Sequence, residues 1–253
     1  MQSYKLTVAY DGTDYHGWQW QPHQRSVDRV LREAFLKTFN RTCMLVGASR
    51  TDAGVHAAGQ VVRIKTDLVI EPQKLRWILN NALPEDIVIT DLVLADPKFH
   101  PQHAVALKTY HYTFFTQRPT PTVQRFGAFI QRPVDFEKLS RALTLFLGEH
   151  DFRAYCKEVP EKNTVKTINA IALFPCEKTG GVVIKITGKS FLRFMIRRIV
   201  GAAFAAATQS NVQINDLKKA LFEKKMAKVL PTAPAKGLCL MQIDYYQKME
   251  DLI

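Results

Sequence analysis

The chain has 253 residues, of which 47% are apolar, 10% aromatic and 23% charged, a composition that argues against intrinsic disorder. Its 35 Lys and Arg residues against 23 Asp and Glu give a net charge of +12, which favours a polyanionic partner such as nucleic acid but names no reaction. The length allows one large domain or two of about 100 to 150 residues each.

The cellular location follows from what the sequence lacks. The opening MQSYKLTVAYDG has no basic stretch followed by an apolar run, so we expect no secretory signal. The most apolar segment, 191–207, contains three arginines and is too short and too charged to span a bilayer, which predicts a core helix. The four cysteines are far apart and form no CxxC pair, as in reduced cytosolic proteins. We therefore expect a cytoplasmic protein.

The first part of the chain alternates strands and helices. Ser26 is a plausible N-cap for a helix that follows an irregular loop, and this helix leaves Arg25, Arg29 and Arg32 for solvent or phosphate. Pro72 marks the start of a second helix. The predicted elements, in order, are a strand over 4–10, a loop over 11–25, a helix from 27, a strand over 59–67, a helix over 72–83 and a strand over 86–95.

The second part continues the alternation. The pattern predicts a strand over 106–116, a helix over 136–148, strands over 167–177 and 182–188 joined at Gly180–Gly181, a long helix from Ser190, a short helix over 215–224 and a last strand over 237–246. Two αβ halves, residues 1–105 and 106–253, are the simplest partition.

One loop carries the residues best suited to chemistry. The segment from Gly47 to Ala57, GASRTDAGVHA, places Asp52 two residues after Arg50, whose guanidinium favours the ionised carboxylate. Gly47 and Gly54 allow positive φ and the close approach of a ribose-sized substrate. These features suit a nucleophile or a base, although an Asp beside Gly more commonly stabilises an Asx turn or caps a helix.

The longer segment GASRTDAGVHAAGQVV resembles the signature of the tRNA pseudouridine synthase A family. Further similar segments follow in the family's order: YDGTDYHGWQWQ, RSV, FHPQHAVALKTYHY, LGEHDF, FMIRRIVG and APAKGLCL. The resemblance implies an α+β protein of two α/β halves, with antiparallel sheets related to RNA-recognition (ferredoxin-like) folds and a cleft between the halves. It also implies a homodimer of bacterial type that acts on uridine at positions 38, 39 and 40 in the anticodon stem-loop of tRNA.

The resemblance also implies roles for four residues. Asp52 matches the catalytic aspartate, which either attacks C1′ or removes the C2′ proton, and Arg50 matches an arginine that displaces the target base. Tyr110 matches a tyrosine that stacks on the flipped uracil, although core packing is the ordinary role of a strand tyrosine. Arg197 matches the arginine that pairs with the catalytic carboxylate, and Arg198, about a quarter-turn away, is expected to face solvent or phosphate.

The sequence gives no sign of a metal or nucleotide cofactor, because its seven histidines and four cysteines lack metal-ligand spacing and neither a P-loop nor GxGxxG occurs. His56 closes the loop motif and is expected to order the backbone rather than to move protons. The lysines of the C-terminal region fit solvated helix faces better than a phosphate site: Lys218, Lys219, Lys224, Lys225 and Lys228.

Two departures from the family pattern bear on the site. Ser49 replaces a usual glycine, so a positive φ there would be strained. FHPQ replaces FHAR, so Gln102 removes an expected phosphate contact and Pro101 stiffens the approach. Two other functions remain open on the sequence: a non-catalytic tRNA-binding or folding protein, and a carboxylate hydrolase of nucleosides or sugars, which needs a second acid.

Overall fold

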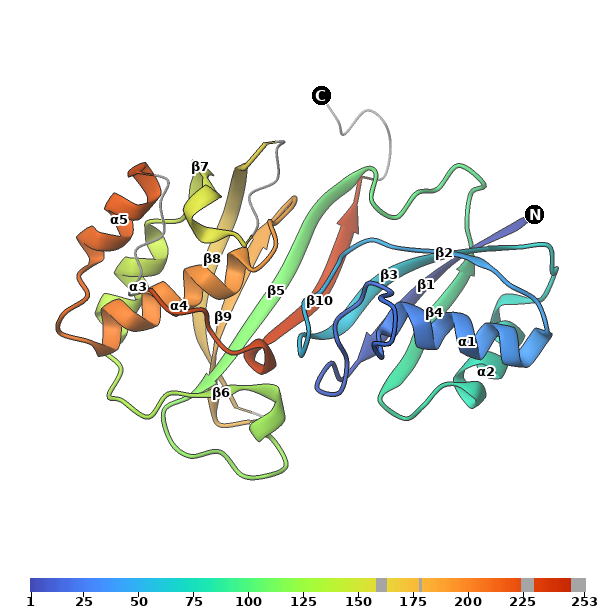
Figure 1. The fold of residues 1–253 in the computed structure, drawn as a ribbon, viewed down its shortest axis with the longest axis horizontal. Coiled ribbons are helices and arrows are strands. Elements are labelled where there is room, and N and C mark those ends of the chain that lie inside the picture. The colour runs from blue at the N-terminus through green and yellow to red at the C-terminus, as the bar shows by residue number, and fades with distance from the viewer. Residues whose placement is uncertain (158–162, 178, 224–229, 247–253) are drawn as a thin grey trace. The chain divides into compact units, whose positions relative to one another are not determined.

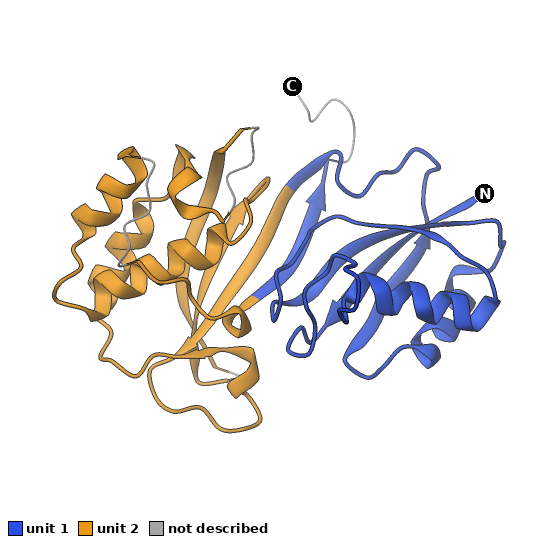
Figure 2. Cartoon of the chain, in the orientation of Figure 1, with its two compact units in different colours: residues 1–106, 239–253 blue, residues 107–238 orange. Residues whose placement is uncertain are grey.

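The computed structural model divides the chain into two compact units, coloured separately in Figure 2: residues 1–106 with 239–253, and residues 107–238. Both units combine helices with strands that pair mostly antiparallel (Figure 1). The structure describes all residues except 158–162, 178, 224–229 and 247–253.

The first unit contains β1 (Gln2–Tyr10), α1 (Val27–Phe39), β2 (Met44–Gly47), β3 (His56–Thr66), α2 (Pro72–Ala82), β4 (Ile87–Leu94) and β10 (Leu238–Tyr245). Its strands lie in the order β4-β1-β3-β10, and β2 also pairs with β3. All these pairs are antiparallel except that of β10 with β3, which is parallel.

Alternation along β1 explains the core of this unit. Leu6 and Val8 are buried whereas the intervening Thr7 is half-buried, as expected for a strand with one face against helices. Helices α1 and α2 pack against each other, and α2 also packs against β4. Asn80 of α2 exchanges two hydrogen bonds with the backbone of Ile89, which fixes the helix on the edge strand.

The start of α1 corrects one expectation and adds to another. Ser26 lies at the N-cap position, but its side chain makes no capping bond and its hydroxyl is buried without a hydrogen-bond partner. Arg25, Arg29 and Arg32 remain partly open to solvent, as expected, but each also pairs with a carboxylate, those of Asp86, Glu33 and Asp28 respectively. The helix itself begins where the sequence predicts.

The second unit contains β5 (Val105–Phe115, of which the last nine residues fall in this unit), β6 (Ala128–Phe129), α3 (Phe136–Thr144), β7 (Gly148–Asp151), β8 (Val165–Cys176), β9 (Gly181–Gly188), α4 (Met195–Thr208) and α5 (Ile214–Glu223). Short 3₁₀ turns occur at η1 (Gln124–Phe126), η2 (Phe152–Tyr155) and η3 (Ala235–Gly237). The strands lie in the order β5-β9-β8-β7, all antiparallel, and β6 adds to β5 in parallel.

Several element boundaries differ from the sequence prediction. Strands β2, β6 and β7 were not predicted, because two to four residues show no alternation that can be recognised. Helix α4 begins at Met195 rather than at Ser190, since Phe194 has a left-handed backbone with φ +64°. The last strand, β10, pairs with β3 in the first unit and was expected with the second half.

The fold class is mixed α and β, with five α-helices among the residues that the structure describes. None of these helices is both long and apolar enough to cross a membrane.

Candidate functional site

The Asp52 loop joins β2 to β3 in the first unit, and not a helix to a strand as the sequence suggested. Its centre is a hydrogen-bonded turn in which the Val55 N–H donates to the Asp52 carbonyl over 3.1 Å. Gly54, the third residue of this turn, has φ +75°, which confirms the expected positive φ and matches a type II turn. Asp52 is half-buried and Arg50 is exposed. The loop therefore presents an acid and a guanidinium from a rigid turn.

The loop over 11–26 packs against the Asp52 loop. The N–H of Trp18 donates to the Thr51 carbonyl and the N–H of Gly54 donates to the Tyr15 carbonyl, both over 3.1 Å. Gly17 lies between these contacts with φ +89°, and a Cβ there would stand 2.6 Å from the Thr51 oxygen. This close approach requires glycine, so residue 17 helps to set the position of Thr51 and Asp52.

Buried polar side chains fix the start of the Asp52 loop. Gln60, which is fully buried in β3, accepts from the Ser49 N–H over 3.1 Å and donates to the Ser49 carbonyl over 2.7 Å. The hydroxyls of Tyr10 and Thr51 lie 2.8 Å apart and share a hydrogen bond. Because buried polar groups are costly to leave unpaired, these bonds favour one loop conformation.

His56 orders the backbone at the end of the loop. Its Nδ1 accepts from the Gly12 N–H over 3.0 Å, and the ring is 4% exposed. Asp11 Oδ1 lies 3.1 Å from the same nitrogen, so the His56 ring contacts both the backbone and a side chain of the segment after β1. This arrangement supports the structural role expected for His56.

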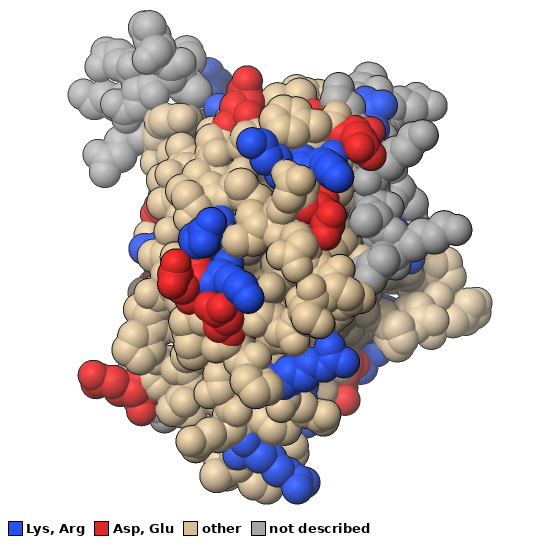
Figure 3. All heavy atoms as spheres, turned by 90° about the vertical axis from the view of Figure 1, so that its left-hand side faces the viewer, with Lys and Arg blue, Asp and Glu red and all other residues tan. Residues whose placement is uncertain are grey.

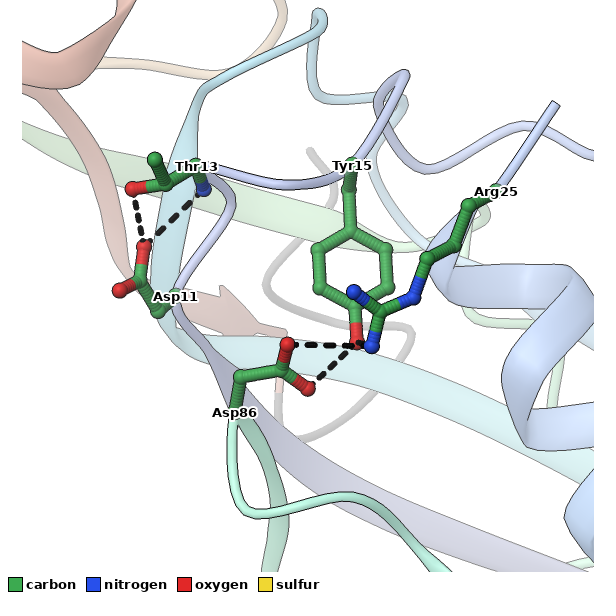
Figure 4. Close-up of polar contacts among 5 residues, drawn as sticks. All are labelled: Asp11, Thr13, Tyr15, Arg25 and Asp86. Carbon is green, nitrogen blue, oxygen red and sulfur yellow. Dashed lines mark hydrogen bonds and ion pairs between the residues drawn. The ribbon is translucent and has the colours of Figure 1, made fainter.

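A network of three side chains anchors the loop over 11–26 (Figure 4). The Tyr15 hydroxyl donates to Asp86 Oδ1 over 2.5 Å, and Arg25 Nη2 lies 3.0 Å from that hydroxyl and 3.2 Å from Asp86 Oδ2. The Arg25 guanidinium also stacks on the Tyr15 ring at 4.4 Å. Burial, followed by the bond to Asp86, raises the pKa of Tyr15. The network therefore fixes Tyr15, whose backbone carbonyl accepts the hydrogen bond from the Gly54 N–H.

The structure shows the surroundings of both departures from the family pattern. Ser49 does not have a positive φ, so the replacement of glycine causes no backbone strain. Gly47 lies in β2 without a positive φ, and glycine is needed there because a Cβ would stand 2.4 Å from the Trp18 ring. Gln102 donates to the Gly47 carbonyl over 2.8 Å, and the Pro101 carbonyl accepts from Tyr245 over 2.6 Å. Gln102, although exposed, thus holds the end of β2 from which the Asp52 loop starts.

Tyr110 and Tyr112 lie on the face of β5 that packs against α4 and the segment preceding it, as alternation predicts. Tyr110 is 6% exposed, and its ring meets Phe191 edge-on at 5.4 Å. The Tyr112 ring packs on Phe204 of α4, and its hydroxyl donates to the Pro234 carbonyl over 3.0 Å. Burial raises the pKa of Tyr112, whereas the Arg197 charge lowers it. Packing against aromatic neighbours is therefore part of the role of Tyr110.

Arg197 is half-buried in the first turn of α4. Its Nε donates to the Ala233 carbonyl and its carbonyl accepts from the Ala233 N–H, each over 2.9 Å. The neighbouring Arg198 was expected to face solvent or phosphate, but its Nη1 donates to the Cys156 carbonyl. Arg198 is thus a structural residue that ties α4 to the end of η2.

The four expected site residues divide equally between the units, with Asp52 and Arg50 in the first and Tyr110 and Arg197 in the second. The sequence interpretation missed the residues that support the Asp52 loop: Tyr15, Gly17, Trp18, Gln60 and Asp86. Gln60 had a detectable signal, since it is a polar residue within the otherwise apolar start of a strand. Asp86 had none, because its partner is 71 positions away.

The positive charge is unequally distributed between the units. Residues 107–238 include 22 of the 35 Lys and Arg residues but only 9 of the 23 Asp and Glu residues. The first unit therefore has almost no net charge. On the face of the second unit shown in Figure 3, where α3 and α5 lie, basic and acidic side chains are interspersed. The excess is thus not gathered on that face. Lys218 and Lys219 are exposed on α5, and Lys224, Lys225 and Lys228 lie outside the described residues.

Metal ligation has no evident place in the part of the chain that the structure describes, since no three His, Cys, Asp or Glu side chains are grouped as ligands would be.

Comparison with known proteins identifies the family. Residues 6–101 and 142–246 match the family model described as tRNA pseudouridine synthase. The chain is 36% identical over 251 residues to tRNA pseudouridine synthase A 1 of Protochlamydia amoebophila, covering 97% of each chain. It is 33% identical to the tRNA pseudouridine synthase A of Thermodesulfovibrio yellowstonii, over 97% of this chain and 100% of that one.

A third relative, the tRNA pseudouridine synthase A of Shouchella clausii, is 37% identical over 96% of this chain and 93% of that one. Among solved structures, a Cbf5-Nop10-Gar1 complex matches 81% of this chain and 54% of that chain at 10% identity, but its TM-score of 0.36 does not establish a shared fold. The family model and the near full-length relatives do establish the family. The chain belongs to the tRNA pseudouridine synthases.

Proposed function

We propose that this protein isomerises uridine to pseudouridine at positions 38, 39 and 40 in the anticodon stem-loop of tRNA, with Asp52 as the catalytic residue. The observation that carries the proposal is the Asp52 loop itself. It retains the RTDAGVH motif and is held by the bonds of Gln60, Trp18 and Tyr15 to its backbone. Such a preorganised loop suits a reaction that depends on the exact placement of one carboxylate.

The reaction needs no redox change and no group donor. The bond from C1′ to uracil N1 breaks, the base rotates, a bond from C1′ to C5 forms, and the proton on C5 is released while N1 gains one. Asp52 either attacks C1′ to give a covalent intermediate or removes the C2′ proton to give a glycal. Both routes use an ionised carboxylate, which the neighbouring Arg50 guanidinium favours.

Three further residues are proposed to bind the substrate. The uridine must leave its stack to react, and an Arg50 side chain in the vacated space offsets part of the unstacking cost. The Tyr110 ring provides a surface for the flipped uracil, and Arg197 provides a cation whose Nε is already oriented by Ala233. The positive charge of residues 107–238 suits a phosphate-rich partner.

The larger setting follows from the family. We propose that the protein acts on tRNA in the cytoplasm as a homodimer. We also propose that its two α/β halves are related to ferredoxin-like RNA-recognition folds. Sedimentation of the purified protein with and without tRNA tests the dimer, since a monomer in both samples contradicts it.

The replacement Asp52→Asn tests the catalytic assignment. Asn keeps the shape of the side chain but cannot act as nucleophile or base, so we expect pseudouridine formation to fall by at least about a hundredfold. Binding of tRNA, measured by fluorescence anisotropy, should remain within about threefold of the wild type, since most affinity for tRNA comes from phosphate contacts. Mapping pseudouridine in unmodified tRNA also reads the modified positions.

A matched control separates a catalytic effect from a general loss of charge. Asp14 is an exposed carboxylate in the adjacent loop, and Asp14→Asn should leave pseudouridine formation unchanged. Substantial activity of Asp52→Asn would overturn the assignment. Free uracil or ribose among the wild-type products would instead favour the carboxylate hydrolase.

A further inference from the structure

Three cationic side chains surround one aromatic ring at the start of α4. The ring centroid of Phe194 lies 4.7 Å from the Arg197 guanidinium, 5.6 Å from that of Arg193 and 5.4 Å from the Lys157 ammonium. Arg197 lies in the first turn of α4, Arg193 precedes the helix, and Lys157 follows η2. We name Lys157, Arg193, Phe194 and Arg197 the Phe194 cluster.

Hydrogen bonds connect the segment that contains Lys157 to the segment that contains Arg193, Phe194 and Arg197. The Lys157 N–H donates to the Arg193 carbonyl over 3.1 Å, and Arg198 donates to the Cys156 carbonyl from its side chain. Phe194 itself has φ +64° and ψ −2°, a conformation that bulky side chains rarely adopt. The surrounding structure must enforce this backbone, and strained backbone of this kind is a common feature of binding sites.

The electrostatics of the Phe194 cluster favour an anion. Lys157, Arg193 and Arg197 place three positive charges around one ring, each in a cation–π contact with Phe194. The cluster lies at the N-terminus of α4, where the helix dipole adds further positive potential, and the first turn of α4 contains no acidic residue. A negative group bound here would be stabilised by all four contributions.

The accessible members of the cluster indicate which anion. Lys157 and Arg193 are exposed, so a group on a large molecule can reach them. Both belong to the unit that carries the positive excess of the chain. Guanidinium and ammonium groups side by side are typical ligands of phosphate.

We infer that the Phe194 cluster binds a phosphodiester group of the tRNA substrate, with Lys157 and Arg193 as its direct ligands. This inference rests on the proposed function for the identity of the RNA. Since Arg197 belongs to both the cluster and the proposed substrate-binding residues, the phosphate belongs to a nucleotide close to the target uridine. The Phe194 ring orders the cations but makes no bond to the phosphate.

The double variant Lys157→Gln with Arg193→Gln tests the inference by its effect on tRNA binding at several salt concentrations. Loss of the contacts should weaken binding at about 0.15 M salt by about fivefold for each charge removed, and reduce the slope of log affinity against log salt by about 0.7 to 0.9 for each. The charge-conserving variant Lys157→Arg with Arg193→Lys should keep the slope of the wild type.

The control is Arg141→Gln with Lys138→Gln, which removes two exposed charges of α3 that already pair with Glu137 and Asp135. This control should leave the affinity and the salt slope unchanged. Thermal unfolding should show the same midpoint for all variants, because the substituted side chains are exposed.

A chemical substitution locates the phosphate. Anticodon stem-loop RNAs are prepared with one neutral methylphosphonate at a time, and one position near the target uridine should weaken binding to the wild type but not to the double glutamine variant. Equal weakening of both proteins at every position, or wild-type salt dependence of the variant, overturns the inference and leaves the proposed function intact. Absence of pseudouridine formation by the wild type instead contradicts the proposed function.

Discussion

At the scale of single residues, the conformation of the candidate site depends on buried side chains. Gln60 illustrates this dependence. Its side-chain amide accepts from the Ser49 N–H and donates to the Ser49 carbonyl, and Ser49 lies three residues before Asp52. An amide that both donates and accepts within the core fixes the backbone more firmly than a surface contact would. The position of Asp52 is therefore set in part from β3.

Replacement of Gln60 by Leu should destabilise the protein and slow the reaction. Leu fills a similar volume but makes neither bond to Ser49, and removing the partner of a buried polar group costs about 1 to 3 kcal/mol. We expect a lower midpoint of thermal unfolding and, well below that midpoint, a lower kcat for pseudouridine formation with nearly unchanged tRNA affinity.

Gln73→Leu is the matched control, since Gln73 is exposed on α2 and the same substitution there should change stability by less than about 0.5 kcal/mol. A Gln60→Leu protein with normal kcat would show that the bonds to Ser49 do not position Asp52.

Sequence reasoning at this scale was confirmed for the backbone of Gly54 and failed for residues that depend on distant partners. It selected the Asp52 loop and the positive φ of Gly54, which depend on neighbours in the chain. Ser49 and Arg198 could not be interpreted correctly, because one needed its actual φ and the other its bond to Cys156. Long-range partners leave no local pattern, so the sequence alone cannot reveal them.

At the scale of elements, two loops distant in sequence shape each other. The loop over 11–26 supplies Trp18 and Tyr15 as backbone partners of the Asp52 loop, and Asp86 anchors Tyr15 from the segment before β4. Irregular loops tolerate such precise contacts only where glycine permits close approach. Gly17 is that position here.

Gly17→Ala should therefore impair catalysis more than an otherwise similar substitution. Gly17 has φ +89° and Gly148 has φ +90°, so alanine at either site pays about 1 to 2 kcal/mol for the left-handed backbone. Only at Gly17 would the new Cβ press on the Thr51 carbonyl, since nothing lies within 4 Å of a Cβ at Gly148.

The expected result is a loss of stability in both variants, measured by chemical unfolding, with a fall in kcat for Gly17→Ala alone. A comparable fall in kcat for Gly148→Ala would mean that activity follows overall stability and not the position of Thr51 and Asp52.

The elements themselves were predictable to different degrees. Long amphipathic helices such as α2, which begins at Pro72 as expected, have both a periodic pattern and a start signal. The predicted start of α4 was wrong because a phenylalanine gives no sequence signal for the left-handed backbone found at Phe194. Strand β2 was missed because four residues are too few for a pattern, although it leads directly into the Asp52 loop.

At the scale of the whole molecule, the net charge of +12 is unequally distributed between the two units. The excess of basic residues falls entirely within residues 107–238, whereas the Asp52 loop belongs to a unit with almost no net charge. Composition therefore predicted a polyanionic partner, and the division into units assigns the attraction for that partner to the unit without the proposed catalytic residue.

The rate at which tRNA associates with the protein should reveal which unit attracts it. Arg118 and Arg132 are exposed in the second unit, and neither forms an ion pair with a described residue. The double variant Arg118→Gln with Arg132→Gln should slow the association of tRNA in stopped-flow measurements, most strongly at low salt. In the first unit, Arg29 and Arg41 already pair with Glu33 and Asp67.

Arg29→Gln with Arg41→Gln removes the same total charge and is the matched control for this measurement. Because charges more than about 8 Å apart are largely screened at physiological salt, only substitutions close to the approaching RNA should change the rate. We therefore expect the control to associate with tRNA nearly as fast as the wild type. Equal slowing of both variants would mean that tRNA responds to the total charge of the protein, and the assignment of the attraction to residues 107–238 would then be wrong.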